Sequence, residues 1–132
     1  MKESNANWQD LGLLFLRVMM GAGIAYHGYG KVFGGHMPML IDGVTKMGLP
    51  FPEMMAWAAA LSEFAGGILV VLGLFTRPAA LAIFVTMTVA AFVTHKADPL
   101  QVKELALAYW TMSGALVFLG GGSFSVAGLI KK

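Results

Sequence analysis

The chain has 132 residues, of which 58% are hydrophobic and only 12% are charged. Soluble domains carry roughly 25% charged residues, so this composition excludes an ordinary soluble protein and indicates one membrane domain over residues 1–132. The net charge of +2 comes without a basic cluster, so we expect the lipid bilayer as a partner and no nucleic acid. The absence of cysteine excludes disulfides, thiolate metal sites and dithiol relays.

Four segments have the length and apolar character of membrane-spanning helices, which need about 20 mostly apolar residues. They lie at about residues 10–30, 53–75, 78–95 and 103–120. Lipid cannot satisfy exposed strand edges, so the predicted fold class is all-α, an integral membrane four-helix bundle. The opening stretch MKESNANWQD has no apolar core and no Ala-x-Ala pattern follows it, so we expect no cleaved signal peptide.

The first apolar segment contains Arg17 and ends in AYHGYGK, which includes Tyr26, His27, Tyr29 and Lys31. His27 and Lys31 are four residues apart and therefore share one face of the helix end. This polar end either meets the membrane surface or forms one wall of a polar site.

Residues 31–52 are predicted to form a long loop, and they are rich in glycine and proline. Connections of this length within a compact domain are often functional. The stretch VTKMGLPFPEMMAW indicates a short amphipathic piece, a break and a return to the membrane. We expect a lid or an interfacial re-entrant segment, with a disordered exposed loop as the alternative.

The second apolar segment carries Glu63, which is followed by Gly66 and Gly67. At a rise of about 1.5 Å per residue, Glu63 lies near the middle of the membrane. A lipid-facing charge is unfavourable by about 2.5–3.5 kcal/mol, so we expect Arg17 and Glu63 to pair inside the bundle. The alternative is that Arg17 extends to the surface while a protonated Glu63 bonds to a neighbouring helix. The two glycines predict a close helix crossing.

His95 closes the third apolar segment and Glu104 opens the fourth, so both lie at the same membrane face as His27. Ordinary capping at the interface is one interpretation, and a shared polar pocket under the long loop is the other. Two His and one Glu are residue types that bind metal ions. No HxxxH or ExxH pair lies on one helix, however, so we predict no metal site. The predicted proton-exchanging residues are His27, Glu63, His95 and Glu104, and the predicted binding residues are Arg17, Tyr26, Lys31, Tyr109 and Trp110.

Two stretches suggest an internal repeat of a helical hairpin. The sequence GGILVVLG at 66–73 and the sequence SGALVFLG at 113–120 share five identities in eight positions. A duplicated hairpin is one explanation, and chance agreement among Gly, Leu and Val is the other.

The stretches LFLRVMMGAGIAYHGYGKVFG, SEFAGGILVVLGLFTRPAAL and GGGSFSV resemble the DoxX family of small bacterial and archaeal membrane proteins. The resemblance runs from about Leu11 to Val126. It implies a four-helix protein of the cytoplasmic (inner) membrane with cytoplasmic termini. The orientation is taken from the resemblance, because counting positive residues does not decide between the two sides of the membrane. Some members are associated with thiosulfate:quinone oxidoreductase and others with redox-stress complexes. The family-like polar residues are Arg17, His27, Lys31, Glu63, Arg77, His95 and Glu104.

Three functions fit these features. The first is a redox accessory in which a quinone or small apolar ligand sits between helices and exchanges protons with the polar residues. The second is a non-catalytic scaffold that docks a soluble redox enzyme through residues 31–52. The third is a small transporter that works as a homo-oligomer, because charges inside the membrane often mark pathways.

Overall fold

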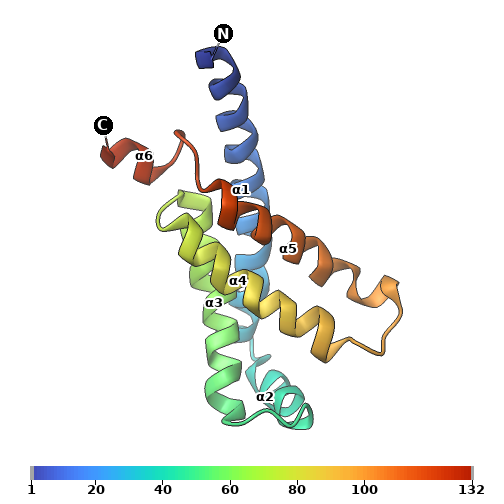
Figure 1. Ribbon diagram of the computed structural model, residues 1–132. Coiled ribbons are helices and arrows are strands. Elements are labelled where there is room, and N and C mark those ends of the chain that lie inside the picture. Colours follow the sequence, from blue (N-terminus) through green and yellow to red (C-terminus); the bar gives the residue numbers. More distant parts are fainter. Residues whose placement is uncertain (1, 132) are drawn as a thin grey trace.

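The structure is a computed structural model that describes residues 2–131, with side chains described for residues 8–130. All regular structure in this part of the chain is helical (Figure 1). The elements in order are α1 (Lys2–Val32), α2 (Met37–Lys46), α3 (Pro52–Leu72), α4 (Thr76–Val89), a π-helical turn η1 (Ala90–Thr94), α5 (Leu100–Leu119) and α6 (Val126–Lys131).

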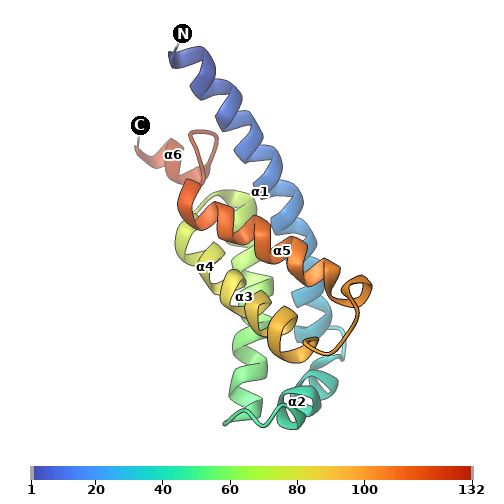
Figure 2. The ribbon, with the colours of Figure 1, turned by 45° about the vertical axis from the view of Figure 1, so that its right-hand side comes forward.

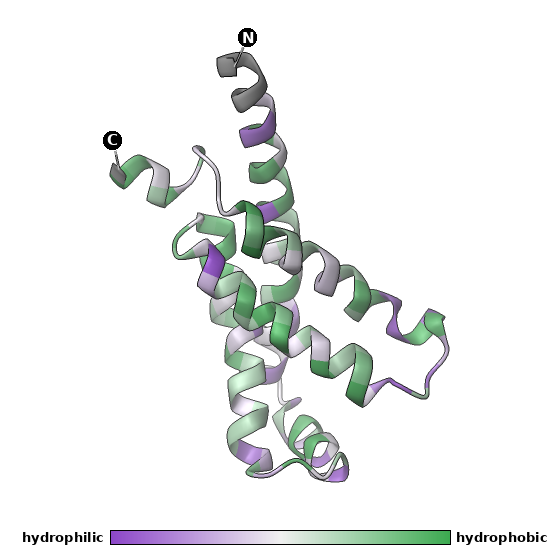
Figure 3. Cartoon of the chain, viewed as in Figure 1, coloured by the Kyte–Doolittle hydropathy of each residue, from purple (hydrophilic) through white to green (hydrophobic). Residues whose placement is uncertain are grey.

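Four helices in the described residues are long and apolar enough to cross a membrane, which confirms the predicted fold class. They are Trp8–Val32, Pro52–Leu72, Thr76–Thr94 and Leu100–Leu119. Hydrophobic residues dominate these helices, and hydrophilic residues gather at the connections (Figure 3). The main difference from the predicted ranges is at the start, because α1 already begins at Lys2.

The spanning helices form two antiparallel pairs that cross each other. Helices α1 and α3 lie side by side, and the pair α4 and α5 runs obliquely across them (Figures 1 and 2). A buried apolar cluster joins the pairs, with Met20 and Ile24 from α1, Val70 from α3, and Ile83 and other residues from α4 and α5. Both described chain ends lie at the end of the molecule opposite α2.

Glycines bring α1 and α3 into close contact. A Cβ added at Gly67 would lie 2.7 Å from the carbonyl oxygen of Gly21, and one added at Gly28 would lie 2.7 Å from the Cα of Phe64. Two backbones can approach this closely only where side chains are absent. The crossing that GG at 66–67 predicts is therefore present, and it fixes the register between α1 and α3.

The segment 31–52 is not the simple loop that its composition predicts, because it contains helix α2. The side chains of Met37 and Val44 are buried against Ala56 and Ala60 of α3, so α2 packs on the first half of α3. The disordered alternative is wrong for this segment. Helix α2 is followed by a break and by the start of α3, in the order that the sequence predicts for this segment.

The hairpin repeat is not confirmed. Gly73 and Gly120 each follow a helix with a positive φ, of 72° and 76°, but their ψ angles are 36° and −168°, so the two similar stretches end their helices differently. The connections differ, because α1 and α3 are joined through α2 whereas α4 and α5 are joined by residues 95–99.

Candidate functional site

A pocket of about 170 Å³ lies where α1, α3, η1 and α5 meet, at the end of the molecule nearer to α2. Four chemically active side chains line it, and they come from three helices and the residue after η1. The remaining walls are aliphatic. The lining residues are Ile24, His27, Glu63, Met87, Ala90, His95, Val102, Leu105, Ala106 and Tyr109.

Glu63 is the buried charge of this pocket, with 3% of its side chain exposed. Its Oε2 lies 2.5 Å from Nζ of Lys31, which is 28% exposed. A carboxylate inside the membrane is strongly unfavourable unless a cation or hydrogen bonds compensate it, and Lys31 supplies both. Lys31 reaches Glu63 because the glycine contact at Gly28 sets the end of α1 directly against α3.

The predicted pairing of Arg17 with Glu63 is wrong. Arg17 is fully buried, but it lies against the other end of α3, beside Gly73, and its Nη2 donates a hydrogen bond to the carbonyl oxygen of Phe124 at 2.5 Å. Helices α1 and α3 are antiparallel, and residues that lie opposite each other have numbers that sum to about 90. This register explains why the predicted pairing is wrong. Arg17 is thereby placed near Gly73, several turns away from Glu63.

His27 and Tyr109 face each other across the pocket. Their ring centroids are 6.0 Å apart in an edge-to-face arrangement, which is favourable for aromatic pairs. Gly23 of α1 leaves room for Tyr109, because a Cβ at this position would overlap the phenolic oxygen. The α1–α5 contact therefore depends on a missing side chain at Gly23.

His95 reaches the pocket from the end of η1. The N–H of His95 donates to the carbonyl oxygen of Ala90 at 3.0 Å, a bond across five residues that characterises a π-helix. Its Nδ1 lies 2.7 Å from Oδ2 of Asp98, whose side chain is 43% exposed. Asp98 thus connects the pocket wall to the surface, and the sequence reasoning missed it. The signal was present in HKAD, where the spacing of three residues brings the carboxylate back to the imidazole.

Five predicted site residues do not line the pocket: Arg17 and Lys31, described above, and three others. Tyr26 is 77% exposed on the outside of α1, and Glu104 is exposed at the start of α5. Trp110 stacks on Phe84 with centroids 5.3 Å apart and donates its Nε1–H to Oγ1 of Thr88 at 3.0 Å, so it joins α5 to α4. Tyr109, its neighbour in the chain, lines the pocket instead.

The described side chains include no group of three or more His, Cys, Asp or Glu placed to hold a metal ion. The polar side chains at the pocket are of types that exchange protons and form hydrogen bonds. Glu63 and Lys31 form an ion pair, His27 and His95 are bases that can carry a proton, and Tyr109 is a hydroxyl donor. The roles assigned to these residues remain predictions.

The sequence matches the model of the DoxX family over residues 12–96. An uncharacterized protein of Haemophilus influenzae is 34% identical to it over 118 residues, covering 84% of each chain. The inner membrane protein YqjF of Escherichia coli is 29% identical over 130 residues, covering 94% of this chain and 95% of YqjF. The inner membrane protein YphA of Escherichia coli is 35% identical over 91 residues, covering 65% of this chain and 56% of YphA. No solved structure matches the chain.

Proposed function

The chain belongs to the DoxX family, and we propose that its pocket at Glu63 holds the ring of a quinone, or a similarly small apolar ligand, and exchanges protons with it. One observation carries this proposal: a buried, lysine-paired carboxylate lies in a pocket whose other walls are mostly aliphatic. Apolar walls with a few convergent polar groups are typical of small-molecule sites.

The size of the pocket favours a ring over a whole lipid-like molecule. Pockets for drug-sized ligands measure roughly 300–1,000 Å³, whereas this one has about 170 Å³. A quinone ring fits such a volume, and its isoprenoid tail would lie along the exposed apolar surface of the helices, among the acyl chains.

The polar residues suit the proton part of the reaction. Reduction of a quinone to a quinol consumes two electrons and two protons. We assign the protons to His27, His95 and the Glu63–Lys31 pair, with Asp98 as the connection to the surface. The electrons would come from a soluble redox enzyme, so this proposal includes such a partner.

We place the protein in the cytoplasmic (inner) membrane with both termini on the cytoplasmic side. Two relatives are named as inner membrane proteins, and the four spanning helices put both ends of the chain on one face. In this orientation the pocket lies toward the periplasmic half of the membrane.

Binding of a short-chain ubiquinone to the detergent-purified protein tests the proposal. A ligand at about 100 times its Kd stabilises the folded state by about 2.7 kcal/mol, which is visible as a rise in the thermal unfolding temperature. We expect this rise for the unmodified chain and a rise at least several-fold smaller for Glu63→Gln.

Glu104→Gln is the matched control, because it makes the same chemical change at an exposed carboxylate outside the pocket. It should leave the quinone-dependent shift unchanged. A chain whose unfolding temperature does not respond to quinone, or a Glu63→Gln variant that responds like Glu104→Gln, would refute the proposed site.

A further inference from the structure

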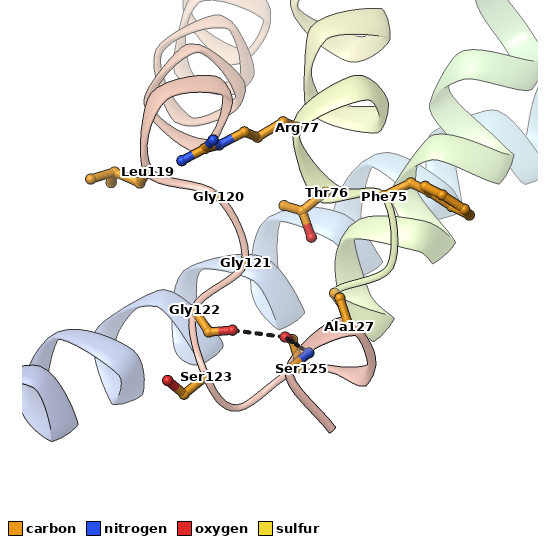
Figure 4. A pocket seen from close by; sticks show the side chains of 12 residues that line it. Phe75, Thr76, Arg77, Leu119, Gly120, Gly121, Gly122, Ser123, Ser125 and Ala127 are labelled. Carbon is orange, nitrogen blue, oxygen red and sulfur yellow. Dashed lines mark hydrogen bonds between the residues drawn. The ribbon is translucent and has the colours of Figure 1, made fainter. Parts of the chain in front are cut away.

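A second pocket, of about 650 Å³, lies at the opposite end of the molecule from the Glu63 pocket. It is enclosed by the turn between α3 and α4 and by the segment that joins α5 to α6 (Figure 4). The residues used below are Thr76 and Arg77 at the start of α4 and Gly120–Gly122 and Ser125 of the joining segment.

The start of α4 gives this pocket a positive potential. The first N–H groups of a helix have no partner within the helix, and the helix dipole adds about half a positive charge there. The residue before α4 is Phe75, whose side chain cannot accept a hydrogen bond from them. The first turn carries Arg77 and no acidic residue, so the uncapped helix start faces the pocket together with a cation.

Thr76 supplies an unused hydrogen-bonding group. The residue is only 7% exposed, and within the described part of the chain its Oγ1 has no hydrogen-bond partner. Figure 4 shows this hydroxyl pointing toward the segment between Gly121 and Ser125. A Cβ at Gly121 would lie 2.7 Å from Oγ1, so only a glycine fits against this hydroxyl. A buried hydroxyl without a partner is unfavourable by about 1–3 kcal/mol, unless a ligand satisfies it.

The surrounding charges sum to a net positive value. Arg77 lines the pocket and is held only by a long hydrogen bond of 3.3 Å to the carbonyl oxygen of Phe118. Arg17 is buried behind Gly73, and its Nε and Nη1 have no partner among the described residues. Among the side chains described for residues 8–130, the carboxylate that contacts this segment is that of Asp10, whose Oδ1 accepts the N–H of Ser123.

The pocket lies at a membrane boundary. Helix α3 has 21 residues and is therefore about 31 Å long, close to the ~30 Å hydrocarbon thickness of a bilayer. The pocket begins directly after its last residue, Leu72. This is the depth at which lipid headgroups carry their phosphates.

We propose that this pocket binds a phosphate group. Arg77, the hydroxyl of Thr76 and the backbone N–H groups of Thr76 and Arg77 are its contacts, since Pro78 has no N–H and that of Ala79 donates to Phe75. Arg17 contributes charge from behind. Helix starts, arginines and hydroxyls are the groups that proteins use to bind phosphate. The phosphate belongs either to the headgroup of an anionic phospholipid or to a free anion, and the experiment distinguishes the two.

The test measures retained lipid by native mass spectrometry on the full chain in detergent micelles doped with phosphatidylglycerol, with diacylglycerol as the phosphate-free comparison. We expect one retained phosphatidylglycerol and no retained diacylglycerol. Arg77→Gln should lower the retained fraction about ten-fold, since a hydrogen bond to a charged group contributes about 1.5–3 kcal/mol. Thr76→Val should lower it several-fold while the protein without lipid becomes more heat-stable, because the unpartnered hydroxyl is gone.

Lys103→Gln is the control, since it removes a half-buried cation at the other end of the molecule and should retain lipid like the unmodified chain. Displacement of the lipid by millimolar inorganic phosphate would support a free anion as the ligand, and resistance to displacement would support the headgroup. Equal retention by Arg77→Gln, Thr76→Val and Lys103→Gln, or equal retention of diacylglycerol, would overturn the proposal. The Glu63 pocket is not involved, so its proposed function stands or fails separately.

Discussion

Single glycines decide where the charged side chains of this membrane protein meet. Lys31 and Glu63 pair because Gly28 allows α1 to touch the backbone of α3 at Phe64. The register that these glycine contacts set between α1 and α3 also separates Arg17 from Glu63, although both are charged residues inside spanning helices. In such a closely packed bundle, the register between helices decides which residue a charged side chain pairs with. The length of the side chain does not decide it.

Replacement of Gly28 by Ala should separate the Lys31–Glu63 pair. The new Cβ meets backbone atoms of Phe64, which cannot rotate away, so we expect a loss of about 1–3 kcal/mol of folding free energy. Gly12→Ala is the control, because nothing lies within 4 Å of a Cβ at this position and alanine favours a helix by about 0.5–1 kcal/mol. Thermal unfolding in detergent measures both variants. A Gly28→Ala protein as stable as the Gly12→Ala protein would contradict the close contact.

At the scale of elements, two irregular pieces shape the pocket at Glu63. The π-helical turn η1 sets the direction of His95, and π-turns often occur at functional sites. Helix α2 packs on α3, and the hydroxyl of Thr94 in η1 donates to Sδ of Met47 just after α2, at 3.1 Å. The residue after α2 therefore contacts η1, the element directly before His95.

Deletion of Val93 should convert η1 into a continuous α-helix and turn His95 away from the pocket. Each residue turns an α-helix by about 100°, so removing one exposed residue changes the direction of all that follow. We expect a folded protein with a several-fold weaker quinone-dependent thermal shift. The substitution Val93→Ala keeps the π-turn and should behave like the unmodified chain. A deletion variant with an undiminished shift would show that the direction of His95 is unimportant.

At the scale of the whole molecule, the two ends have different characters. The end near α2 holds an ion pair, two imidazoles and a phenol around a small pocket, whereas the end with both termini holds two arginines around a glycine-rich segment. We place the arginine-rich end in the cytoplasm. Anionic lipids give the cytoplasmic leaflet a negative surface potential, which attracts such a cluster.

The orientation is testable because the chain has no cysteine, so an introduced cysteine is unique. Thr45→Cys in α2 and Ser123→Cys between α5 and α6 are both at exposed positions. In intact cells, a membrane-impermeant maleimide should label the cysteine at position 45. It should reach the cysteine at position 123 only after the cells are permeabilised. Labelling in the reverse order would place the termini in the periplasm.

The sequence by itself determined the membrane location, the four spanning helices and the types of residue at the site, because apolar length and buried charge are local properties. It predicted that His27, Lys31, His95 and Glu104 lie at one membrane face, with Glu63 near the middle of the membrane, whereas the structure places His27, Glu63, His95 and Tyr109 around one pocket. Only the tertiary structure decided the partner of Glu63, the exclusion of Tyr26, Glu104 and Trp110, and the contribution of Asp98. Helix rotation, register and the π-turn set these outcomes, and they depend on how backbones pack against each other, which hydropathy along one chain does not encode.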